Sequence, residues 1–491
     1  MLRTKEQYIE ALGKMKRNVY FNGEKIDRSD EVQMPTIDVM ATTYDKAQDP
    51  DPKIQELMLA KSHLTGETIN RFTHIHMSAD DLHKKQDMTR YLCREVGGCI
   101  QRCMGIDATN AIYNVSYEAD KQNNGSTQYH ENFKKWLERF QREDLVGCCA
   151  QTDVKGDRLK RPHEQVDPDL YVRVKETKSD GIVVSGCKLH ISEASVADEI
   201  LVVPTRSLRP EDKDYAVAFA VPGDWDGVKQ VVTVHNYRKR EHFPRGFMPG
   251  ATDSYVIFDD CFVPWDRVFL NGEYVHGGVL ALLFALFHRH SYSGCKPAIG
   301  DVLLGSAALA AEMNNIHKMG HVREKLAEII LTTELGYAAG YTASDQGKAE
   351  VYMPGMGFVP YGPGSFIPNS IYANVGRCLT GEAVYREQEI LCDISGGVPA
   401  TFPYEEDWVN PETKDLLEKY VMRNPKISAK NAANFWRFMG DILCSATGGI
   451  TNMGNYHGGG SPVMEQIAIT TQYDIEDRKD LVRRLAGITK D

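Results

Sequence analysis

Several features that mark large protein classes are missing from this sequence. The longest run of apolar residues, Val279 to Phe287, is too short to cross a bilayer. The first residues, Met1 to Glu6, lack the basic and apolar pattern of a secretory signal, so we expect a cytoplasmic protein. Acidic residues outnumber basic ones by 68 to 57, and the net charge of -11 disfavours nucleic acid as a partner, because phosphate binding needs clustered Lys and Arg.

Internal repeats and low-complexity tracts are also missing, and the cysteines do not form the even set of a disulfide framework. There are 11 of them in a chain without secretory marks, which favours reduced thiols or metal ligands. Most are expected to be small buried hydrophobes in apolar or strand-like segments: Cys148, Cys149, Cys187, Cys261, Cys378, Cys392 and Cys444. The other four, Cys93, Cys99, Cys103 and Cys295, include the candidates for metal ligation.

The composition is that of a soluble globular protein with more than one domain. Hydrophobic residues make up 42% of the chain and charged residues 25%, and 491 residues exceed the size of a single hydrophobic core. The patterns are helical, then strand-like, then helical. They predict an α+β fold with an N-terminal helical domain (residues 1–146), a middle antiparallel β-domain (147–273) and a C-terminal helical bundle (274–491).

Helical periodicity and capping signals place the expected helices. They are residues 6–15, 53–64, 79–97 and 126–142 before the β-domain, and 297–313, 322–344, 383–393 and 430–447 after it. A hairpin is expected at Asn22-Gly23. Short apolar runs between residues 171 and 258, broken by Gly, Pro and Asp, predict the strands.

The stretch from Phe284 to Lys296, FALFHRHSYSGCK, concentrates reactive side chains on a helix. Its residues His288, Tyr292 and Cys295, at positions i, i+4 and i+7, would share one face over roughly 10 Å. Apolar residues upstream would bury this helix, and buried imidazole, phenol and thiol groups need partners. This face predicts a metal centre. The alternative is that these side chains form a polar part of the core without a metal.

A second cysteine-containing segment, Gly97 to Gly105, places Cys99 and Cys103 four residues apart. On one face of a helix, this spacing lets two thiolates reach one centre. Together with His288 and Cys295 they supply four ligands, the number that a 4Fe-4S cluster requires. Zinc bound by three cysteines and one histidine is the alternative that these ligand types leave open.

Several polar or glycine-rich segments are candidates for cofactor binding. Gln151 to Arg158 opens the β-domain, and Gly186 to Ser192 lies on a later strand; each is an exposed turn or strand end in the simplest interpretation. The pair Gly396-Gly397 would allow close approach of a pyrophosphate, although glycine also commonly ends a helix. The basic segment 238–245 would meet the phosphates of coenzyme A or form a solvated turn.

These pieces occur together in one known fold family. The order of helices, β-domain and helices resembles the acyl-CoA dehydrogenase fold and its flavin hydroxylase relatives over nearly the whole chain. Cys99-x3-Cys103 with His288-x6-Cys295 resembles the 4-hydroxybutyryl-CoA dehydratase and vinylacetyl-CoA isomerase family in particular, because the other members lack this ligand set. The resemblance implies a 4Fe-4S cluster on these four residues, FAD beside it, and a homotetramer in which subunits share the flavin sites.

The resemblance also assigns residues to the flavin. The run Lys188-Leu-His190-Ile-Ser192 is similar to a family strand whose hydroxyl lies near flavin N5, so Ser192 is the candidate for that contact. The glycines Gly396 and Gly397 resemble the pair that receives the adenosine diphosphate end of the cofactor. The segment after the first strand of the β-domain matches the family's flavin-binding segment: Gln151, Thr152, Asp153, Lys155, Gly156, Asp157 and Arg158.

The activity that the resemblance implies is radical dehydration of 4-hydroxybutyryl-CoA, or a close 4-hydroxyacyl-CoA, to crotonyl-CoA, together with isomerisation of vinylacetyl-CoA. A base removes the α-proton and the flavin takes one electron, which makes the β-hydrogen acidic. We expect His288 to be both ligand and proton acceptor. Tyr292 would protonate or orient the leaving hydroxyl, and Lys296 would stabilise negative charge.

Two positions depart from the family pattern. Asp253, a further catalytic candidate, stands where relatives carry Glu, and Gly459 stands in a turn where a catalytic glutamate is expected. The second departure leaves the acyl chain of the substrate open. Two other interpretations remain: a flavin-dependent acyl-CoA oxidoreductase or aromatic hydroxylase without a cluster, and a helical scaffold with structural zinc.

Overall fold

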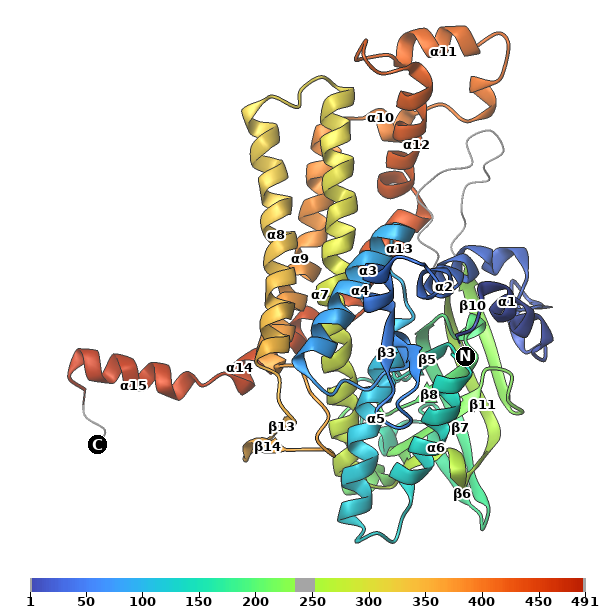
Figure 1. Cartoon of the computed structure of the whole chain (residues 1–491), viewed down its shortest axis with the longest axis vertical. Helices are drawn as coiled ribbons and strands as arrows, with labels where there is room; N and C mark the ends of the chain where they lie inside the picture. The colour runs from blue at the N-terminus through green and yellow to red at the C-terminus, as the bar shows by residue number, and fades with distance from the viewer. Residues whose placement is uncertain (1, 235–251, 489–491) are drawn as a thin grey trace.

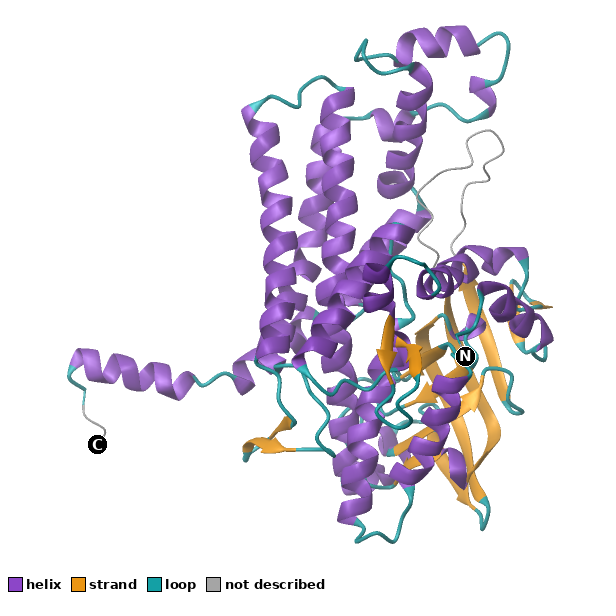
Figure 2. Ribbon diagram, in the orientation of Figure 1, coloured by secondary structure: helices purple, strands orange, loops and turns teal. Residues whose placement is uncertain are grey.

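A computed structural model describes residues 2–234 and 252–488 (Figure 1). Helices form the N- and C-terminal parts of the chain, and most strands lie between them in sequence (Figure 2). The predicted α+β order is therefore confirmed, while the domain boundaries at residues 146 and 273 stay predictions. The basic segment 238–245 lies outside the described residues.

Local signals explain where the N-terminal helices begin and end. The Thr4 side chain and Gln7 form a capping box before α1, and Gly97, at φ 70°, ends α4 in the left-handed conformation. The helix predicted over residues 53–64 is wrong beyond Met58, because the chain continues there as a strand that pairs with a second one. The helices are α1 (Lys5–Lys14), α2 (Met34–Ala47), α3 (Pro52–Met58), α4 (Ala79–Val96), α5 (Cys103–Gln122) and α6 (Tyr129–Arg142), and the two strands are β3 (Leu59–Lys61) and β4 (Thr68–Asn70).

The strands form two main sheets. Within the described residues, the larger has the order β2 (Glu24–Ile26), β1 (Val19–Phe21), β10 (Val228–Val234), β11 (Thr252–Pro264), β7 (Gly181–Ser192) and β6 (Arg173–Thr177). The smaller has the order β12 (Val268–Asn271), β9 (Val217–Pro222), β8 (Glu199–Val202) and β5 (Gly147–Ala150). The predicted hairpin at Asn22-Gly23 is confirmed, with both residues at positive φ. The antiparallel prediction is wrong for two pairs, β1 with β10 and β5 with β8, which are parallel.

One long helix, α7 (Tyr274–Met313), carries the reactive stretch through the centre of the molecule (Figure 1). Its 40 residues span about 60 Å at 1.5 Å per residue. The sequence predicted a helix start at Pro297, but α7 continues through this residue. Proline cannot donate to the carbonyl four residues earlier. That carbonyl, on Ser293, accepts a hydrogen bond of 3.2 Å from Gln86 Nε2 of α4 instead, so α4 supplies the missing donor.

The other C-terminal helices pack around α7 or extend from it. Helices α8 (Gly320–Asp345) and α9 (Ser370–Ser395) lie beside α7, and α9 begins well before the predicted residue 383 because Asn369 caps it. Helix α15 (Ile475–Ala486) projects from the body and has no buried residue (Figure 1). The remaining elements are β13 (Glu350–Met353), β14 (Gly357–Pro360), α10 (Val398–Thr401), α11 (Lys414–Val421), α12 (Ala429–Cys444), α13 (Ala446–His457) and α14 (Pro462–Gln472).

Close packing brings α5 between α7 and the smaller sheet. A Cβ added to Gly105 would overlap the carbonyl oxygen of Gly147 on β5, so glycine lets the start of α5 approach the strand. Helix α5 also packs along α7. This arrangement places the first turn of α5 beside the reactive stretch of α7.

Candidate metal and flavin site

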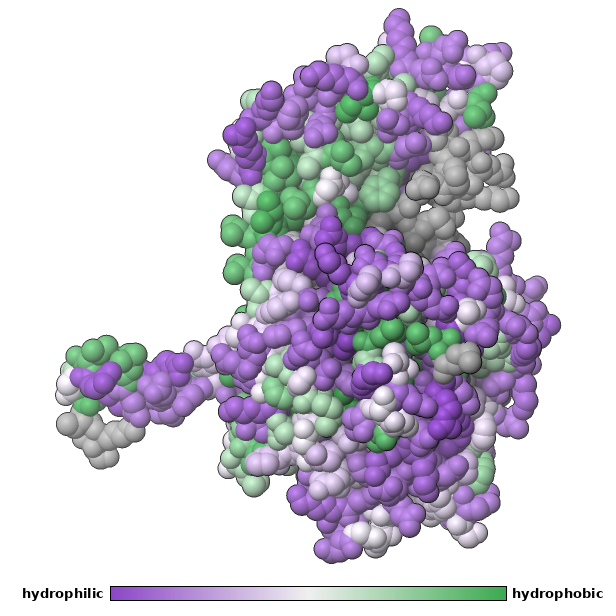
Figure 3. Space-filling model, in the orientation of Figure 1, coloured by the Kyte–Doolittle hydropathy of each residue, from purple (hydrophilic) through white to green (hydrophobic). Residues whose placement is uncertain are grey.

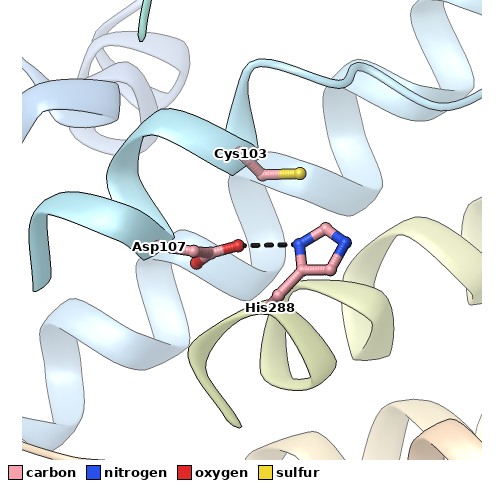
Figure 4. Close-up of side chains that lie close together, drawn as sticks. All are labelled: Cys103, Asp107 and His288. Atoms are coloured by element: carbon pink, nitrogen blue, oxygen red, sulfur yellow. Dashed lines mark hydrogen bonds and ion pairs between the residues drawn. The ribbon is translucent and has the colours of Figure 1, made fainter. Parts of the chain in front are cut away.

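Three potential metal ligands meet where α5 and α7 pack together. Cys103 and Asp107 extend from α5 toward His288 of α7 (Figure 4). One ligand atom from each of the three residues lies within 4.8 Å of the other two, and all three residues are buried. Cys103 and His288, two of the predicted ligands, therefore lie close enough to share one metal centre.

Two more cysteines complete the group. The Cys99 thiol interacts with the thiols of both Cys103 and Cys295, so the four predicted ligands are linked in one series. Of these four, Cys103 and His288 belong to the tight group with Asp107. The sequence predicted Cys99 and Cys103 on one face of a helix. This prediction is wrong, because Cys99 lies before the helix that begins at Cys103. It lies in the segment between α4 and α5, where Gln101 has a φ of 57°. Cys93, near the end of α4, interacts with Cys295. It adds a fourth thiol to the site, and no role for it was predicted from the sequence.

The thiols resist ionisation in this setting. Contact with Cys99 and burial raise the pKa of Cys103 well above its usual range. The pKa of Cys99 is about 12, since the effects of Cys295 and burial outweigh the favourable hydrogen bond from Cys103. Deprotonation of several adjacent thiols requires a nearby positive charge, and metal ions provide it.

The carboxylate of Asp107 orients His288. His288 Nδ1 lies 3.0 Å from Asp107 Oδ2, while the other carboxylate oxygen accepts a 2.9 Å hydrogen bond from the Lys85 ammonium. Burial lowers the pKa of His288, but the hydrogen bonds with Asp107 and Cys103 outweigh it and raise the pKa to about 9. A histidine whose Nδ1 hydrogen is donated to a carboxylate presents its Nε2 lone pair to a metal.

Tyr292 and Lys296 follow His288 on the same face of α7. The Tyr292 ring lies edge-on to His288, with 4.9 Å between ring centroids. The Lys296 ammonium lies 4.5 Å from the centroid of the Tyr292 ring and donates to Asn455 Oδ1 of α13. Burial raises the pKa of Tyr292 well above its usual range and lowers that of Lys296. Both predicted catalytic residues therefore adjoin the ligand group.

The predicted flavin residues of the β-domain lie together on a different surface. Pairing of β7 with β11 sets Ser192 opposite Asp253, and the Ser192 hydroxyl donates to Asp253 Oδ1 at 2.6 Å. His190, at φ 58°, is exposed on the same strand. Asp253 thus contacts a candidate flavin residue of the β-domain.

The segment after β5 is joined both to this surface and to α7. The buried Lys188 ammonium donates to the Gln151 carbonyl at 2.8 Å and pairs with Asp153 at 2.7 Å. Gln151 Nε2 donates to the carbonyl of Ala281, two turns before His288 on α7. Thr152 accepts from the Leu189 amide at 2.7 Å. The rest of the segment is an exposed loop: Lys155, Gly156, Asp157 and Arg158.

The glycine pair predicted to bind the adenosine diphosphate end lies far from these residues. Gly396 and Gly397 follow the end of α9 and are exposed, and the preceding Ile394 carbonyl accepts from Asn314 at the far end of α7. Asn314 is about 39 Å along the helix from His288. A single chain therefore does not bring Gly396 and Gly397 to the other flavin candidates.

Sequence reasoning missed several polar residues around the ligand group. Asp107 carries a usable signal, because it lies four residues after Cys103 and shares its helical face. Asn455, Arg377 and Glu465 have no such signal. They come from later helices and reach α7 only through the packing of the bundle.

The fold and site define a class of protein before any particular relative is considered. Residues 4–270 match the family model described as 4-hydroxyphenylacetate 3-hydroxylase N terminal, and residues 278–487 match its C-terminal counterpart. A solved structure of the oxygenase component of 4-hydroxyphenylacetate 3-monooxygenase complexed with FAD superposes with a TM-score of 0.82 at 26% identity, covering 98% of both chains.

Within this class the chain belongs to the 4-hydroxybutyryl-CoA dehydratase/vinylacetyl-CoA-Delta-isomerase family, as the resemblance predicted. It is 37% identical to the member from Clostridium aminobutyricum, across 99% of this chain and 100% of the relative. An oxygen-tolerant archaeal 4-hydroxybutyryl-CoA dehydratase from N. maritimus has a TM-score of 0.92 at 34% identity, covering 100% of this chain and 96% of that one. A glutaryl-coenzyme A dehydrogenase, at 14% identity and a TM-score of 0.52, shows that the fold is acyl-CoA dehydrogenase-like.

Proposed function

We propose that this protein dehydrates 4-hydroxybutyryl-CoA, or a close 4-hydroxyacyl-CoA, to crotonyl-CoA and isomerises vinylacetyl-CoA to the same product, with FAD and a 4Fe-4S cluster as cofactors. One observation carries the proposal. Cys99, Cys103, His288 and Cys295 converge from two distant segments in a chain that is 37% identical to an enzyme with both activities.

Three cysteines and one histidine suit either an iron–sulfur cluster or structural zinc, so the surroundings of the ligands decide between them. Thiolates are soft ligands that suit iron–sulfur centres, and Cys93 adds a further buried thiol beside the four proposed ligands. The site also lies between helices that carry Tyr292 and Lys296, next to a histidine with a supporting carboxylate. A purely structural metal site has no need of these groups.

When bound, the flavin would supply one-electron chemistry and the cluster a Lewis-acidic iron. The chain's own residues would handle the protons. His288 is our candidate for the base when its Nε2 is free of the metal, because Asp107 holds its ring and can stabilise the imidazolium that would form. Lys85 and Ser291 hydrogen-bond to Asp107 and keep its carboxylate in place.

Tyr292 and Lys296 are our candidates for handling the leaving hydroxyl and negative charge. Tyr292 remains protonated in its buried setting, so its hydroxyl is able to donate to a departing oxygen. Lys296 is held by Asn455 beside the Tyr292 ring, where an ammonium ion would stabilise negative charge on substrate or flavin.

The FAD site is proposed to use the β-domain surface and the segment after β5. Ser192 would contact the flavin ring, with Asp253 as its hydrogen-bond partner and as a further catalytic candidate. The related hydroxylase solved with FAD supports flavin binding by this fold. The proposed FAD contacts are Gln151, Thr152, Asp153, Lys155, Gly156, Asp157, Arg158, Lys188, His190, Ser192, Gly396 and Gly397.

A homotetramer would bring Gly396 and Gly397 of one chain to the β-domain of another. Exposed apolar side chains support this assembly: Ile330, Leu331 and Leu335 on α8, and Leu481, Val482 and Leu485 on the projecting α15. Figure 3 shows apolar residues gathered over α8 and at the outer end of α15. Exposed patches of this kind mark association surfaces.

We further propose a cytoplasmic location. In the part of the chain that the structure describes, every helix is too short or too polar to span a bilayer. An acyl-CoA substrate and reduced thiols suit that compartment.

Anaerobic purification followed by assay tests the proposed function. We expect about four iron and four sulfide ions per chain, bound flavin, and crotonyl-CoA formed from both 4-hydroxybutyryl-CoA and vinylacetyl-CoA. Full iron and flavin without conversion of either thioester would contradict the substrate assignment and leave the fold assignment intact.

The same preparation tests a second candidate, a flavin-dependent aromatic hydroxylase or acyl-CoA oxidoreductase without a cluster. The match to the 4-hydroxyphenylacetate 3-hydroxylase family models favours the hydroxylase among these. Flavin without iron, together with oxygen-dependent hydroxylation of a phenol, would support it.

A further inference from the structure

A buried carboxylate lies close to the ligand group without any hydrogen bond. Glu465, in the first turn of α14, has 0% exposure, and its oxygens accept no hydrogen bond from the described residues. Its nearest cationic atoms are Arg289 Nε and Arg377 Nε, each 3.7 Å away. A buried charge is costly unless it is paired, so the two arginines account for its presence.

The two arginines hold the turn between α13 and α14. Arg289, the residue after His288, donates to the Gly459 carbonyl at 3.0 Å and to Asn374 Oδ1 at 2.7 Å. Arg377 of α9 donates to the Tyr456 carbonyl at 2.9 Å. Two buried guanidinium ions repel one another. Burial raises the pKa of Glu465 to about 7, against the opposing effect of the two arginines, so above that pH its negative charge lies between them and offsets the repulsion.

The turn between α13 and α14 also packs against Tyr292. The Arg377 guanidinium lies 4.6 Å from the centroid of the Tyr292 ring, and a Cβ added to Gly458 would overlap the Tyr292 hydroxyl. A Cβ added to Gly459 would lie only 2.8 Å from Arg377 Nε. A side chain at position 459 would therefore require Arg377 to shift, and the carboxylate that faces the arginines comes from Glu465.

We propose that Glu465 is a positioning residue of the active site, an inference that rests on the proposed function. It holds Arg289 and Arg377 together, and they fix the glycine turn and Tyr292 against the ligand group. Glu465 does not replace the catalytic glutamate expected at Gly459, because it acts through the arginines without contacting the substrate.

A double-mutant cycle of Glu465→Gln and Tyr292→Phe tests this coupling. In the otherwise unchanged enzyme, Glu465→Gln should lower kcat for dehydration of 4-hydroxybutyryl-CoA about 10- to 100-fold, with iron, flavin and KM retained. In the Tyr292→Phe background the same change should cost less than about threefold, because the group it positions is gone. Equal losses in both backgrounds would overturn the proposal.

Controls separate this inference from folding and from the proposed function. Glu389→Gln, which changes an exposed residue of α9 that pairs with Arg386, should leave kcat unchanged. If Glu465→Gln does not fold, the double-mutant cycle is repeated with Glu465→Asp, which keeps the charge on a shorter side chain. Failure of the unchanged, fully loaded enzyme to convert either thioester would refute the function instead.

Hydrogen exchange gives a measurement that does not depend on turnover. The amides of residues 457–460 should exchange faster in Glu465→Gln than in the unchanged protein, because the arginine clamp is loosened. Unchanged exchange in this segment would overturn the proposal even if the enzyme acts on another substrate.

Discussion

The ligand group on α5 and α7 and the flavin candidates of the β-domain differ in how completely one chain builds them. Three members of the ligand group are buried and Cys99 is half-buried, and each member interacts with another member. The flavin candidates are partly exposed, and the glycine pair lies at the opposite end of the helical bundle. The metal-ligand site is therefore set by the fold of one chain, whereas the flavin site is proposed to need a second chain to complete it.

This difference predicts that the two proposed cofactors respond to different changes. Substitutions between α5 and α7 should remove iron and leave the oligomer intact. Substitutions on the exposed apolar helices should weaken flavin binding and leave iron bound.

The largest effect is expected from Cys103→Ser. The substitution removes a thiolate from a closed site, so iron should fall to about a tenth or less of the normal content. Metal analysis of anaerobically purified protein measures this. Cys392→Ser, an exposed change at the end of α9, is the control and should retain full iron. Full iron in Cys103→Ser would show that Cys103 is not a ligand.

A smaller loss is expected from Asp107→Asn. The amide removes the negative charge that holds the His288 ring, and changes of this kind lower metal affinity about 10- to 100-fold. Iron retention against a chelator measures the affinity, with Lys121→Gln, near the end of the same helix, as the matched control. Equal retention in both variants would mean that His288 needs no carboxylate support.

The flavin side of the comparison is tested by Leu481→Glu combined with Leu485→Glu. Charges on the apolar face of α15 should dissociate the proposed tetramer and weaken flavin binding about tenfold or more, with iron unchanged. Light scattering and flavin titration give the two results. Lys479→Glu on the same helix is the control. Normal flavin affinity in a dissociated protein would refute shared flavin sites.

The smallest effect is expected from Cys93→Ala. Cys93 contacts Cys295 but is not among the four proposed ligands, so iron should stay full and unfolding should become easier by only about 1 kcal/mol from the small cavity. Metal analysis and thermal unfolding measure both. Loss of iron would make Cys93 a ligand and change the proposed set.

The sequence predicted the parts of this molecule that depend on local signals. Helix α1, the hairpin at Asn22-Gly23 and the end of α4 follow from caps and glycine conformations that act over a few residues. The four-ligand pattern was found through its spacing within two segments. The position of Cys99 was misjudged because the left-handed Gly97 ends the helix before it.

The rest depends on packing between distant segments. Pro297 indicated a helix boundary, but a glutamine on α4 replaces the lost donor and the helix continues. Glu465 and Arg377 carry no motif, and only the folded bundle brings them to Tyr292. The parallel pairing of β5 with β8 likewise depends on contacts between distant segments, because the alternation of apolar and polar residues along one strand does not specify the direction of its partner.

The bond from Gln86 to the Ser293 carbonyl bears on the order of assembly. Helix α4 leads into the segment that bears Cys99, and the carbonyl it satisfies lies one residue from Gly294 and two from Cys295. Until α4 packs against α7, the proline leaves the Ser293 carbonyl without a donor, two residues from the proposed ligand Cys295. We therefore expect the proposed cluster to be loaded only after these two helices have packed together.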